Sequence, residues 1–305
     1  MLPVRVLLTG WFSFLHGEAT AGDLLASQAV AAALDAAGVA CDTAWSPVFR
    51  PGALALSEAA PERYTHLVFA CGPVYGDQIA SLHVRYQTCR RIAVGVSVID
   101  KNDPACRGFD VLLPRDAPGR TPVRDLAAAA LPEPAARRAL PVTGIFLTAG
   151  QGEYGQRRQH DLVTARLTAW IRTKSCAPLE LDTRLDSRDW RLCSSPEALT
   201  ALMSRLDIVV TTRLHGLVLA LREGVPALAV DPVAGGGKVT AQAAAWNWPA
   251  VLASEQTADH GLLDERWDWC RSALGRSQAA RAAGAPGAGQ PRALLTALVR
   301  AVLDR

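Results

Sequence analysis

The sequence lacks the cysteine patterns that mark disulfide-rich and zinc-binding proteins. Its 7 cysteines are scattered and odd in number, and no pair stands in a C-x-x-C spacing. No other group of histidine, cysteine and acidic residues has metal-ligand spacing, so no metal site and no bound cofactor are predicted, and metal dependence stays open. Unpaired thiols are typical of a reducing compartment, which predicts a cytoplasmic protein.

Long hydrophobic runs and strongly basic segments are also missing. No apolar stretch reaches the length that spans a bilayer, and residues 1–10 are too short for a secretory signal with its cleavage site. Any membrane contact is therefore expected to be peripheral. The net charge of +3 and the lack of a basic run interleaved with aromatics argue against a nucleic-acid partner. A mildly basic chain suits an anionic small molecule, and nothing here indicates an oligomeric state.

The chain is long enough for two domains, with 305 residues of which 50% are hydrophobic and 20% charged. Strand and helix patterns alternate along it, which predicts an α/β fold of two Rossmann-like domains facing a cleft, with parallel sheets and helical crossovers. The predicted parts are an N-terminal domain at 1–120, a proline-rich connection at 121–141 and a C-terminal domain at 142–290. A final helix at 291–305 either ends the chain or returns to the N-terminal domain.

Residues 206–232 predict the central unit of the second domain. An apolar, β-branched run at 207–211 is typical of a buried strand, and Thr211 or Thr212 is expected to cap the helix that follows. From Leu214 onward, apolar residues recur at i, i+3, i+4 and i+7, the pattern of a helix buried on one side. Gly-Val-Pro at 224–226 ends that helix, and an apolar strand continues to residue 230.

Two polar residues interrupt the apolar pattern where this helix begins. Arg213 and His215 lie in or beside the first turn, where free N–H groups and the helix dipole attract phosphate or carboxylate. A guanidinium adds bidentate pairing, so the two residues are interpreted as an anion-binding pair at the carboxyl end of a buried strand. The alternative is a solvated arginine beside a histidine buried in the core.

The stretch Thr-Thr-Arg-Leu-His, followed by an apolar helix and Gly-Val-Pro, resembles the signature of the polysaccharide pyruvyl transferases over residues 206–239. That resemblance implies a two-domain fold like that of the GT-B glycosyltransferases. It also implies phosphoenolpyruvate as the donor, whose pyruvyl group is usually attached to a sugar as a ketal. Arg213, Leu214 and His215 are then expected at the donor site.

A glycine-rich loop after the next strand is a second candidate for the donor site. Gly236 and Gly237 allow successive N–H groups to turn toward an anion, and Lys238 adds a positive charge at the start of the following helix. The loop is not a Walker A motif. Members of the resembled family often have a lysine near this point, which makes Lys238 the second expected phosphate ligand. The alternative is a flexible surface loop.

The G-x-G-x-x-G stretch at 150–155 follows a predicted strand and precedes a helix. A dinucleotide site is disfavoured because Glu153 would place a carboxylate beside the pyrophosphate. The loop is interpreted as one wall of the cleft, where Gln151, Tyr154 and Glu153 hydrogen-bond a sugar. A solvated turn is the alternative.

Asp23 is a further candidate, at the start of the first helix. Gly22-Asp23 is similar to a glycine-aspartate pair of the pyruvyl transferases, although Thr20-Ala21 precedes it where that family commonly has an asparagine. Asp23 is expected either to act on the acceptor or to cap its own helix. Four late tryptophans are expected to pack in the core or to stack on a sugar, namely Trp246, Trp248, Trp267 and Trp269.

These residues lead to one mechanism and two rivals. In the first, His215 donates a proton to the methylene carbon of phosphoenolpyruvate while Asp23 or Glu153 deprotonates the acceptor hydroxyls of a sugar-containing molecule. The second is a GT-B glycosyltransferase that binds a nucleotide sugar, with Glu180 or Asp182 on the ribose. The third is a non-catalytic phosphosugar-binding protein. The acceptor, and a ketal rather than an enol-ether product, cannot be read from the sequence.

Overall fold

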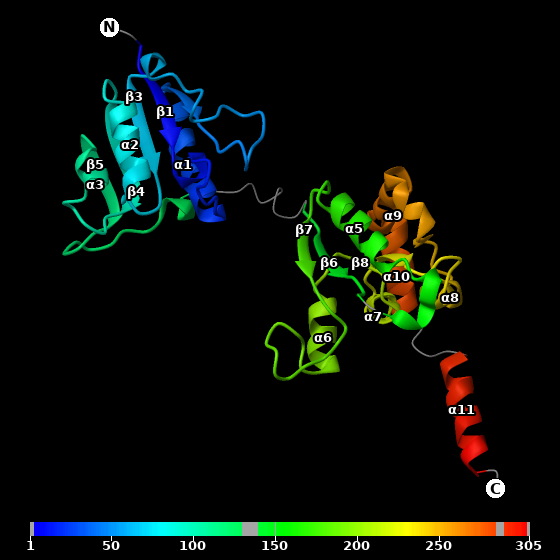
Figure 1. Ribbon diagram of the computed structural model, residues 1–305. Helices are drawn as coiled ribbons and strands as arrows, with labels where there is room; N and C mark the ends of the chain where they lie inside the picture. The colour runs from blue at the N-terminus through cyan, green and yellow to red at the C-terminus, as the bar shows by residue number, and fades with distance from the viewer. Residues whose placement is uncertain (1–2, 130–139, 150, 285–289, 304–305) are drawn as a thin grey trace. The chain divides into compact units, whose positions relative to one another are not determined.

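The computed structural model describes residues 3–129, 140–149, 151–284 and 290–303 (Figure 1). The chain divides into two compact units, Met1–Glu133 and Pro134–Arg305. The division falls within the predicted connection at 121–141, while the predicted domain limits themselves stay predictions.

The N-terminal unit is built on one parallel sheet with the strand order β2-β1-β3-β4-β5. Its strands are β1 (Arg5–Thr9), β2 (Ala40–Thr43), β3 (His66–Ala70), β4 (Arg90–Ser97) and β5 (Val111–Asp116). Its helices are α1 (Ala21–Ala36), α2 (Asp77–Arg85) and α3 (Pro104–Arg107), with short 3₁₀ turns η1 (Trp11–Ser13), η2 (Pro61–Arg63) and η3 (Leu126–Ala128).

The C-terminal unit repeats this topology, with the order β10-β9-β8-β6-β7 and all pairs parallel. Its strands are β6 (Val142–Phe146), β7 (Ala177–Glu180), β8 (Ile208–Thr211), β9 (Ala227–Asp231) and β10 (Val251–Ala253). The helices are α5 (His160–Ile171), α6 (Pro196–Met203), α7 (Leu214–Arg222), α8 (Lys238–Ala245), α9 (His260–Arg271), α10 (Ala273–Ala283) and α11 (Gln290–Leu303), with 3₁₀ turns η4 (Gly152–Arg157) and η5 (Glu255–Ala258).

Both units therefore have a doubly wound, Rossmann-like topology, which confirms the predicted α/β fold with parallel sheets and helical crossovers. In each sheet the strand order reverses between the first and third strands of the unit, β1 and β3 or β6 and β8. Ligands of open parallel sheets bind beyond the carboxyl ends of the strands at such a reversal. The fold thus directs attention to the loops after β6 and β8.

Buried aromatic and aliphatic side chains form the core of the C-terminal unit. Trp170 is fully buried, packs edge-on against Trp267 with ring centroids 5.6 Å apart, and donates its indole N–H to Asp264. Trp248 is also buried, and Trp246 and Trp269 pack against the same core. The late tryptophans therefore pack in or against the core, as one of the two expectations predicted.

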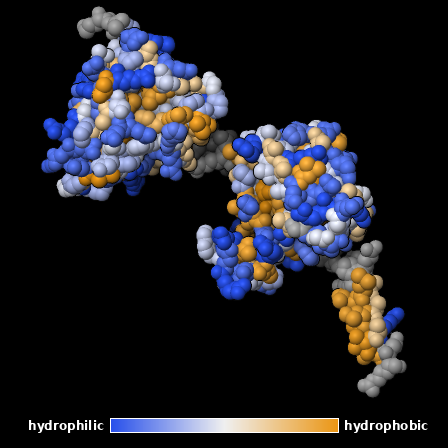
Figure 2. Space-filling view, viewed as in Figure 1, coloured by the Kyte–Doolittle hydropathy of each residue, from blue (hydrophilic) through white to orange (hydrophobic). Residues whose placement is uncertain are grey.

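No helix among the described residues is long and apolar enough to cross a membrane. The helix α11 carries an exposed apolar stripe, visible as the orange side of this segment in Figure 2. Its members are Leu294, Leu295, Leu298, Val299, Val302 and Leu303.

The helix α7 lies unusually close to the strand that precedes it. A methyl group added at Gly216 would meet the Thr211 hydroxyl oxygen at 2.2 Å and the Thr211 Cβ at 3.1 Å. Both residues are buried, so neither the helix nor the strand has room to move aside. Only glycine allows this approach, which fixes the amino end of α7 against β8.

Gly216→Ala is expected to lower the free energy of unfolding by about 1–3 kcal/mol, because overpacking forces a shift of buried backbone. Urea denaturation measures this change. Gly22→Ala is the control, since Gly22 lies in α1 and its added methyl meets nothing closer than 3.7 Å. An equal loss of stability in both variants would contradict the packing explanation.

Candidate active site

Two buried threonines join the ends of β6 and β8. The Thr211 hydroxyl donates to the Phe146 carbonyl at 3.1 Å and accepts the Arg213 backbone N–H at 2.9 Å. The Thr212 hydroxyl accepts the Thr148 backbone N–H at 2.8 Å. These bonds fix the backbone that carries Arg213.

The predicted capping of α7 by Thr211 or Thr212 is wrong. The N-cap residue is Arg213, and its side chain makes no capping hydrogen bond. Thr211 and Thr212 bond the loops of the sheet instead. The first turn of α7 therefore keeps the uncapped N–H groups that attract an anion.

The Arg213 side chain is held in place by the ends of two other strands. Its Nε donates to the Leu147 carbonyl at 3.1 Å and its Nη2 to the Asp182 carboxylate at 3.2 Å. The side chain is only 19% exposed, and burial lowers its pKa while Asp182 opposes that shift. Two of the five N–H donors of the guanidinium are used by these bonds, and the others remain for a ligand.

Asp182, the ion-pair partner of Arg213, was not predicted in this role. The sequence named it only as a ribose ligand in the glycosyltransferase alternative. It follows β7 and accepts from Arg184 as well as Arg213, with its own side chain 16% exposed. Burial acts to raise the pKa of Asp182, but the Arg184 backbone and side-chain hydrogen bonds and the Arg213 charge hold it below its ordinary value. Asp182 therefore stays ionised and orients the guanidinium.

His215 is exposed in the first turn of α7, while Leu214 is partly buried against the core. The His215 side chain has no hydrogen bond or ion pair with any of the described residues. The alternative of a core histidine is thus wrong, and the imidazole is accessible at the edge of the sheet where Arg213 lies.

The glycine loop after β9 is organised around a buried carboxylate. Asp231 is fully buried and accepts the backbone N–H groups of Val233 at 3.1 Å, Gly237 at 2.7 Å and Thr240 at 2.8 Å. The Gly236 N–H donates to the Val233 carbonyl. The N–H groups predicted to bind an anion at Gly236 and Gly237 are therefore already bonded. Asp231 takes the place of the anion at Gly237, and the Val233 carbonyl accepts from Gly236.

Lys238 begins α8 and lies beside the loop after β6. Its Nζ is 5.8 Å from the centre of the Tyr154 ring, which in turn stacks on His160 with centroids 6.2 Å apart. His160 is buried and its Nε2 bonds the Gln151 Oε1 at 3.0 Å. The structure thus brings together three predicted residues, Gln151, Tyr154 and Lys238, through a histidine that the sequence did not reveal.

The environment of His160 favours its neutral form. Burial lowers the pKa of His160, and the charges of Arg158 and Lys238 act in the same direction. A neutral imidazole with the proton on Nε2 donates to Gln151, whose backbone has a left-handed conformation with φ of 64°. The histidine therefore fixes the start of the loop.

Arg157 connects the two loops. Its Nε donates to the Ala234 carbonyl at 3.0 Å and its Nη2 to the Gly236 carbonyl at 2.7 Å. The glycine loop is thus bonded by Arg157 as well as by Asp231. The alternative of a flexible surface loop is therefore wrong.

The two predicted bases lie in different surroundings. Glu153 is exposed in η4, three residues after Gly150, which lies outside the described residues. Asp23 forms a capping box with Thr20, whose hydroxyl donates to the carboxylate at 2.7 Å. Asp23 thus caps its helix, as one of the two interpretations predicted, and it belongs to the N-terminal unit.

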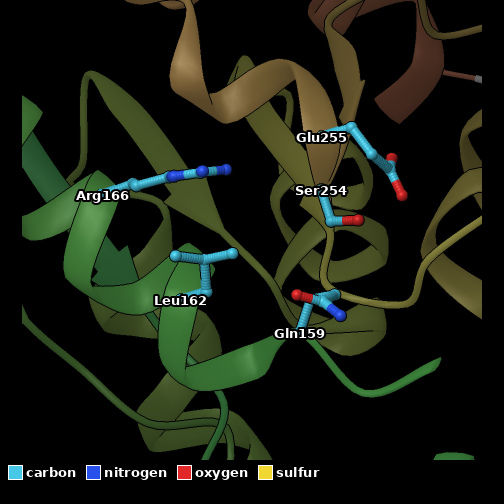
Figure 3. Close-up of a pocket in the computed structure, with 5 residues that line it drawn as sticks. All are labelled: Gln159, Leu162, Arg166, Ser254 and Glu255. Atoms are coloured by element: carbon cyan, nitrogen blue, oxygen red, sulfur yellow. The ribbon is translucent and has the colours of Figure 1, made fainter. Parts of the chain in front are cut away.

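A cavity of about 320 Å³ lies at the carboxyl end of β10 (Figure 3). Its lining residues are Gln159, Leu162, Arg166, Ser254 and Glu255. Figure 3 shows the Arg166 side chain extending from α5 across the cavity, and its Nη1 donates to the Thr257 hydroxyl at 3.3 Å. None of the predicted site residues lines it, so this cavity is separate from the Arg213 site.

Asp182→Asn is expected to lower the free energy of unfolding by about 1–3 kcal/mol at pH 7, because the half-buried guanidinium loses its charge partner. Since the pKa of Asp182 in the folded protein lies below its ordinary value of 3.8, its stabilisation is present above that pH and is lost as the pH falls through the folded pKa. The difference between variant and wild type should therefore shrink below about pH 4.

Urea denaturation at several pH values measures this difference. Asp186→Asn is the matched control, because its partner Arg188 is 89% exposed in the same loop. Equal losses at pH 7 in the two variants would contradict a special role for the Arg213 pair.

Comparison with known proteins places the family signature on this site. The model of the family Polysaccharide pyruvyl transferase matches residues 179–232. This range contains Asp182, Arg213, His215 and Asp231, and it ends before Gly236, Gly237 and Lys238. No protein of curated function matches the sequence significantly.

Two glycosyltransferases are among the solved structures that the chain matches. An E. coli heptosyltransferase, WaaC with ADP, has a TM-score of 0.27 at 12% identity and covers 91% of this chain and 100% of its own. The spinosyn forosaminyltransferase SpnP has a TM-score of 0.30 at 12% identity and covers 99% of this chain and 100% of its own. TM-scores this low carry no argument about function, which has to come from the site. The resemblance to the polysaccharide pyruvyl transferases is confirmed over residues 179–232, from the end of β7 to the end of β9.

Proposed function

We propose that this protein is a pyruvyl transferase that moves the pyruvyl group of phosphoenolpyruvate onto hydroxyls of a sugar-containing acceptor as a ketal. The family match supports a transferase that modifies polysaccharides. One observation carries the finer proposal. Arg213, held by Asp182, begins α7, and His215 is exposed two residues later in the first turn of the same helix.

Donor binding follows from the charges at this edge of the sheet. Phosphoenolpyruvate carries a carboxylate and a phosphate, and the remaining donors of Arg213 suit either group in bidentate fashion. The uncapped N–H groups of α7 lie beside it, and Leu214 carries one of them. Lys238 adds a cation at the end of the neighbouring strand β9, placed there by the loop that Gly236 and Gly237 shape around Asp231.

The chemistry requires a proton donor at the methylene carbon. As the first acceptor hydroxyl bonds to C2 of phosphoenolpyruvate, His215 protonates C3, and the C2–O bond to phosphate then breaks to leave an oxocarbenium ion. The second hydroxyl attacks this ion to close the ketal. Both hydroxyl protons are lost. One is taken by a base and passes from it to restore the proton of His215, and the other leaves with inorganic phosphate.

The base that takes a hydroxyl proton is proposed to be Glu153. Glu153 is exposed and has no bond to the described residues. It lies four residues before Arg157, whose side chain bonds the loop that precedes Lys238. Gln151 and Tyr154, on the same loop as Glu153, are proposed to contact the acceptor.

Phosphoenolpyruvate is expected to raise the melting temperature of the wild type, because saturation at about a hundred times the dissociation constant adds ~2.7 kcal/mol. Arg213→Ala should abolish the shift, and Arg213→Lys and Lys238→Ala should weaken it. The latter two variants keep the test informative if Arg213→Ala folds poorly. Arg222→Ala, at the other end of α7, is the control and should keep the full shift.

Thermal unfolding with nucleotide sugars tests the rival donor. Stabilisation by a nucleotide sugar alone would replace the proposal with a glycosyltransferase. Stabilisation by phosphoenolpyruvate without phosphate release in the presence of any sugar acceptor would indicate a non-catalytic binding protein.

His215→Asn is expected to reduce kcat by about 10²–10⁴-fold while the thermal shift with phosphoenolpyruvate persists, because the amide keeps a polar group but cannot deliver the proton. Inorganic phosphate release measures the rate. Full turnover in this variant would show that another group is the acid.

A further inference from the structure

The loop between β7 and α6 carries an exposed tryptophan that the function proposed above does not use. Trp190 is 92% exposed, whereas Trp170, Trp248 and Trp267 are buried in the core. A tryptophan has a large apolar face that water solvates poorly, and such residues are enriched where proteins contact partners. Trp190 is therefore a candidate contact for a ligand.

The loop is built from three similar turns, and residues 182–193 are named here the Asp–Arg loop. In each turn an aspartate accepts the backbone N–H of an arginine two residues later, at 2.8, 2.8 and 3.1 Å, and also bonds its guanidinium. The pairs are Asp182 with Arg184, Asp186 with Arg188, and Asp189 with Arg191.

A further bond closes the loop. The Asp186 backbone N–H donates to the Cys193 carbonyl at 3.1 Å, and the Leu192 N–H donates to the Asp189 carbonyl at 3.0 Å. Trp190 thus projects from a backbone held on both sides. Presenting an aromatic ring in this way lowers the entropy lost when a ligand packs against it.

The Asp–Arg loop is joined to the donor site through one carboxylate. The Asp182 Oδ2 accepts both from Arg184 Nε at 2.8 Å and from Arg213 Nη2 at 3.2 Å. The loop therefore begins at the residue that orients the proposed donor-binding arginine, at the carboxyl end of β7.

The charges of the loop indicate what kind of ligand fits. The segment has 3 aspartates and 3 arginines, so its net charge is zero. Anionic lipids and polyanions are attracted by an excess of basic residues, which is absent here. A neutral molecule with many hydroxyls fits better, because exposed guanidinium and carboxylate groups hydrogen-bond hydroxyls of either polarity.

We propose that the Asp–Arg loop binds a sugar of the acceptor, with the C–H face of the sugar ring packed against the Trp190 indole. That this sugar belongs to the acceptor rests on the proposed function. The proposal places part of acceptor recognition on the same unit as the donor site.

Binding of the full-length protein to a broad array of immobilised oligosaccharides tests this proposal. The wild type should bind one or more glycans, Trp190→Ala should weaken that binding about tenfold or more, and Trp190→Phe should retain part of it because a ring remains. Leu185→Ala is the matched control, since Leu185 is a 42% exposed apolar residue of the same loop without a ring. It should bind as the wild type does.

The proposal is overturned if the wild type binds no glycan on the array, or if Trp190→Ala binds as strongly as the wild type. Binding of wild type but not Trp190→Ala to vesicles of anionic phospholipid, without glycan binding, would assign the loop to a membrane surface instead. Thermal shifts with phosphoenolpyruvate are measured on the same proteins and should be equal in wild type and Trp190→Ala. Glycan binding that depends on Trp190 without any phosphoenolpyruvate shift would sustain the sugar site and reject the pyruvyl transferase.

Discussion

The half-buried ion pair between Arg213 and Asp182 is the interaction on which the candidate site depends. The carboxyl ends of parallel strands lie at one edge of the sheet. At this edge Arg213 follows β8, and its guanidinium contacts the segments that follow β6 and β7. A charge held in this way has lost most of its side-chain freedom before any ligand arrives. The fold therefore bears in advance an entropic cost that would otherwise weaken binding.

A second carboxylate, Asp231, holds the backbone of the glycine loop in place before any ligand binds. It is fully buried and bonded to three N–H groups, so it organises the glycine loop without any bound anion. Such a carboxylate also supplies a negative charge next to the start of α8, where Lys238 begins the helix. Lys238 follows Gly237 directly, so the Gly237 bond to Asp231 also fixes the backbone from which the lysine projects.

The sequence predicted the parts of this site that depend on local order. The apolar spacing after Leu214 and the strand-like run before it are enough to define β8, α7 and β9, and Arg213 and His215 follow from their position in that unit. Residues whose role depends on a distant partner were missed, because a single sequence does not show that His160 meets Gln151 or that Arg157 reaches the carbonyls of the glycine loop.

Two errors have the same origin. Threonine before a helix is a good cap in general, but Thr211 and Thr212 bond the adjacent strand because β6 lies within reach. Glycine N–H groups are good anion ligands in general, but Asp231 is already there. The clustered tryptophans at 246–269 pack in or against the core, whereas the exposed tryptophan is the isolated Trp190, which periodicity does not distinguish.

The antiparallel bridge between Arg158 and Val233 joins the loops after β6 and β9. The Arg157 side chain reinforces this connection with its bonds to the Ala234 and Gly236 carbonyls. A ligand that orders Lys238 must therefore also restrict Gln151 and Tyr154, and the reverse holds equally, because linkage between two sites is reciprocal. Affinity at one loop is then a function of occupancy at the other, so binding events at the two loops are coupled.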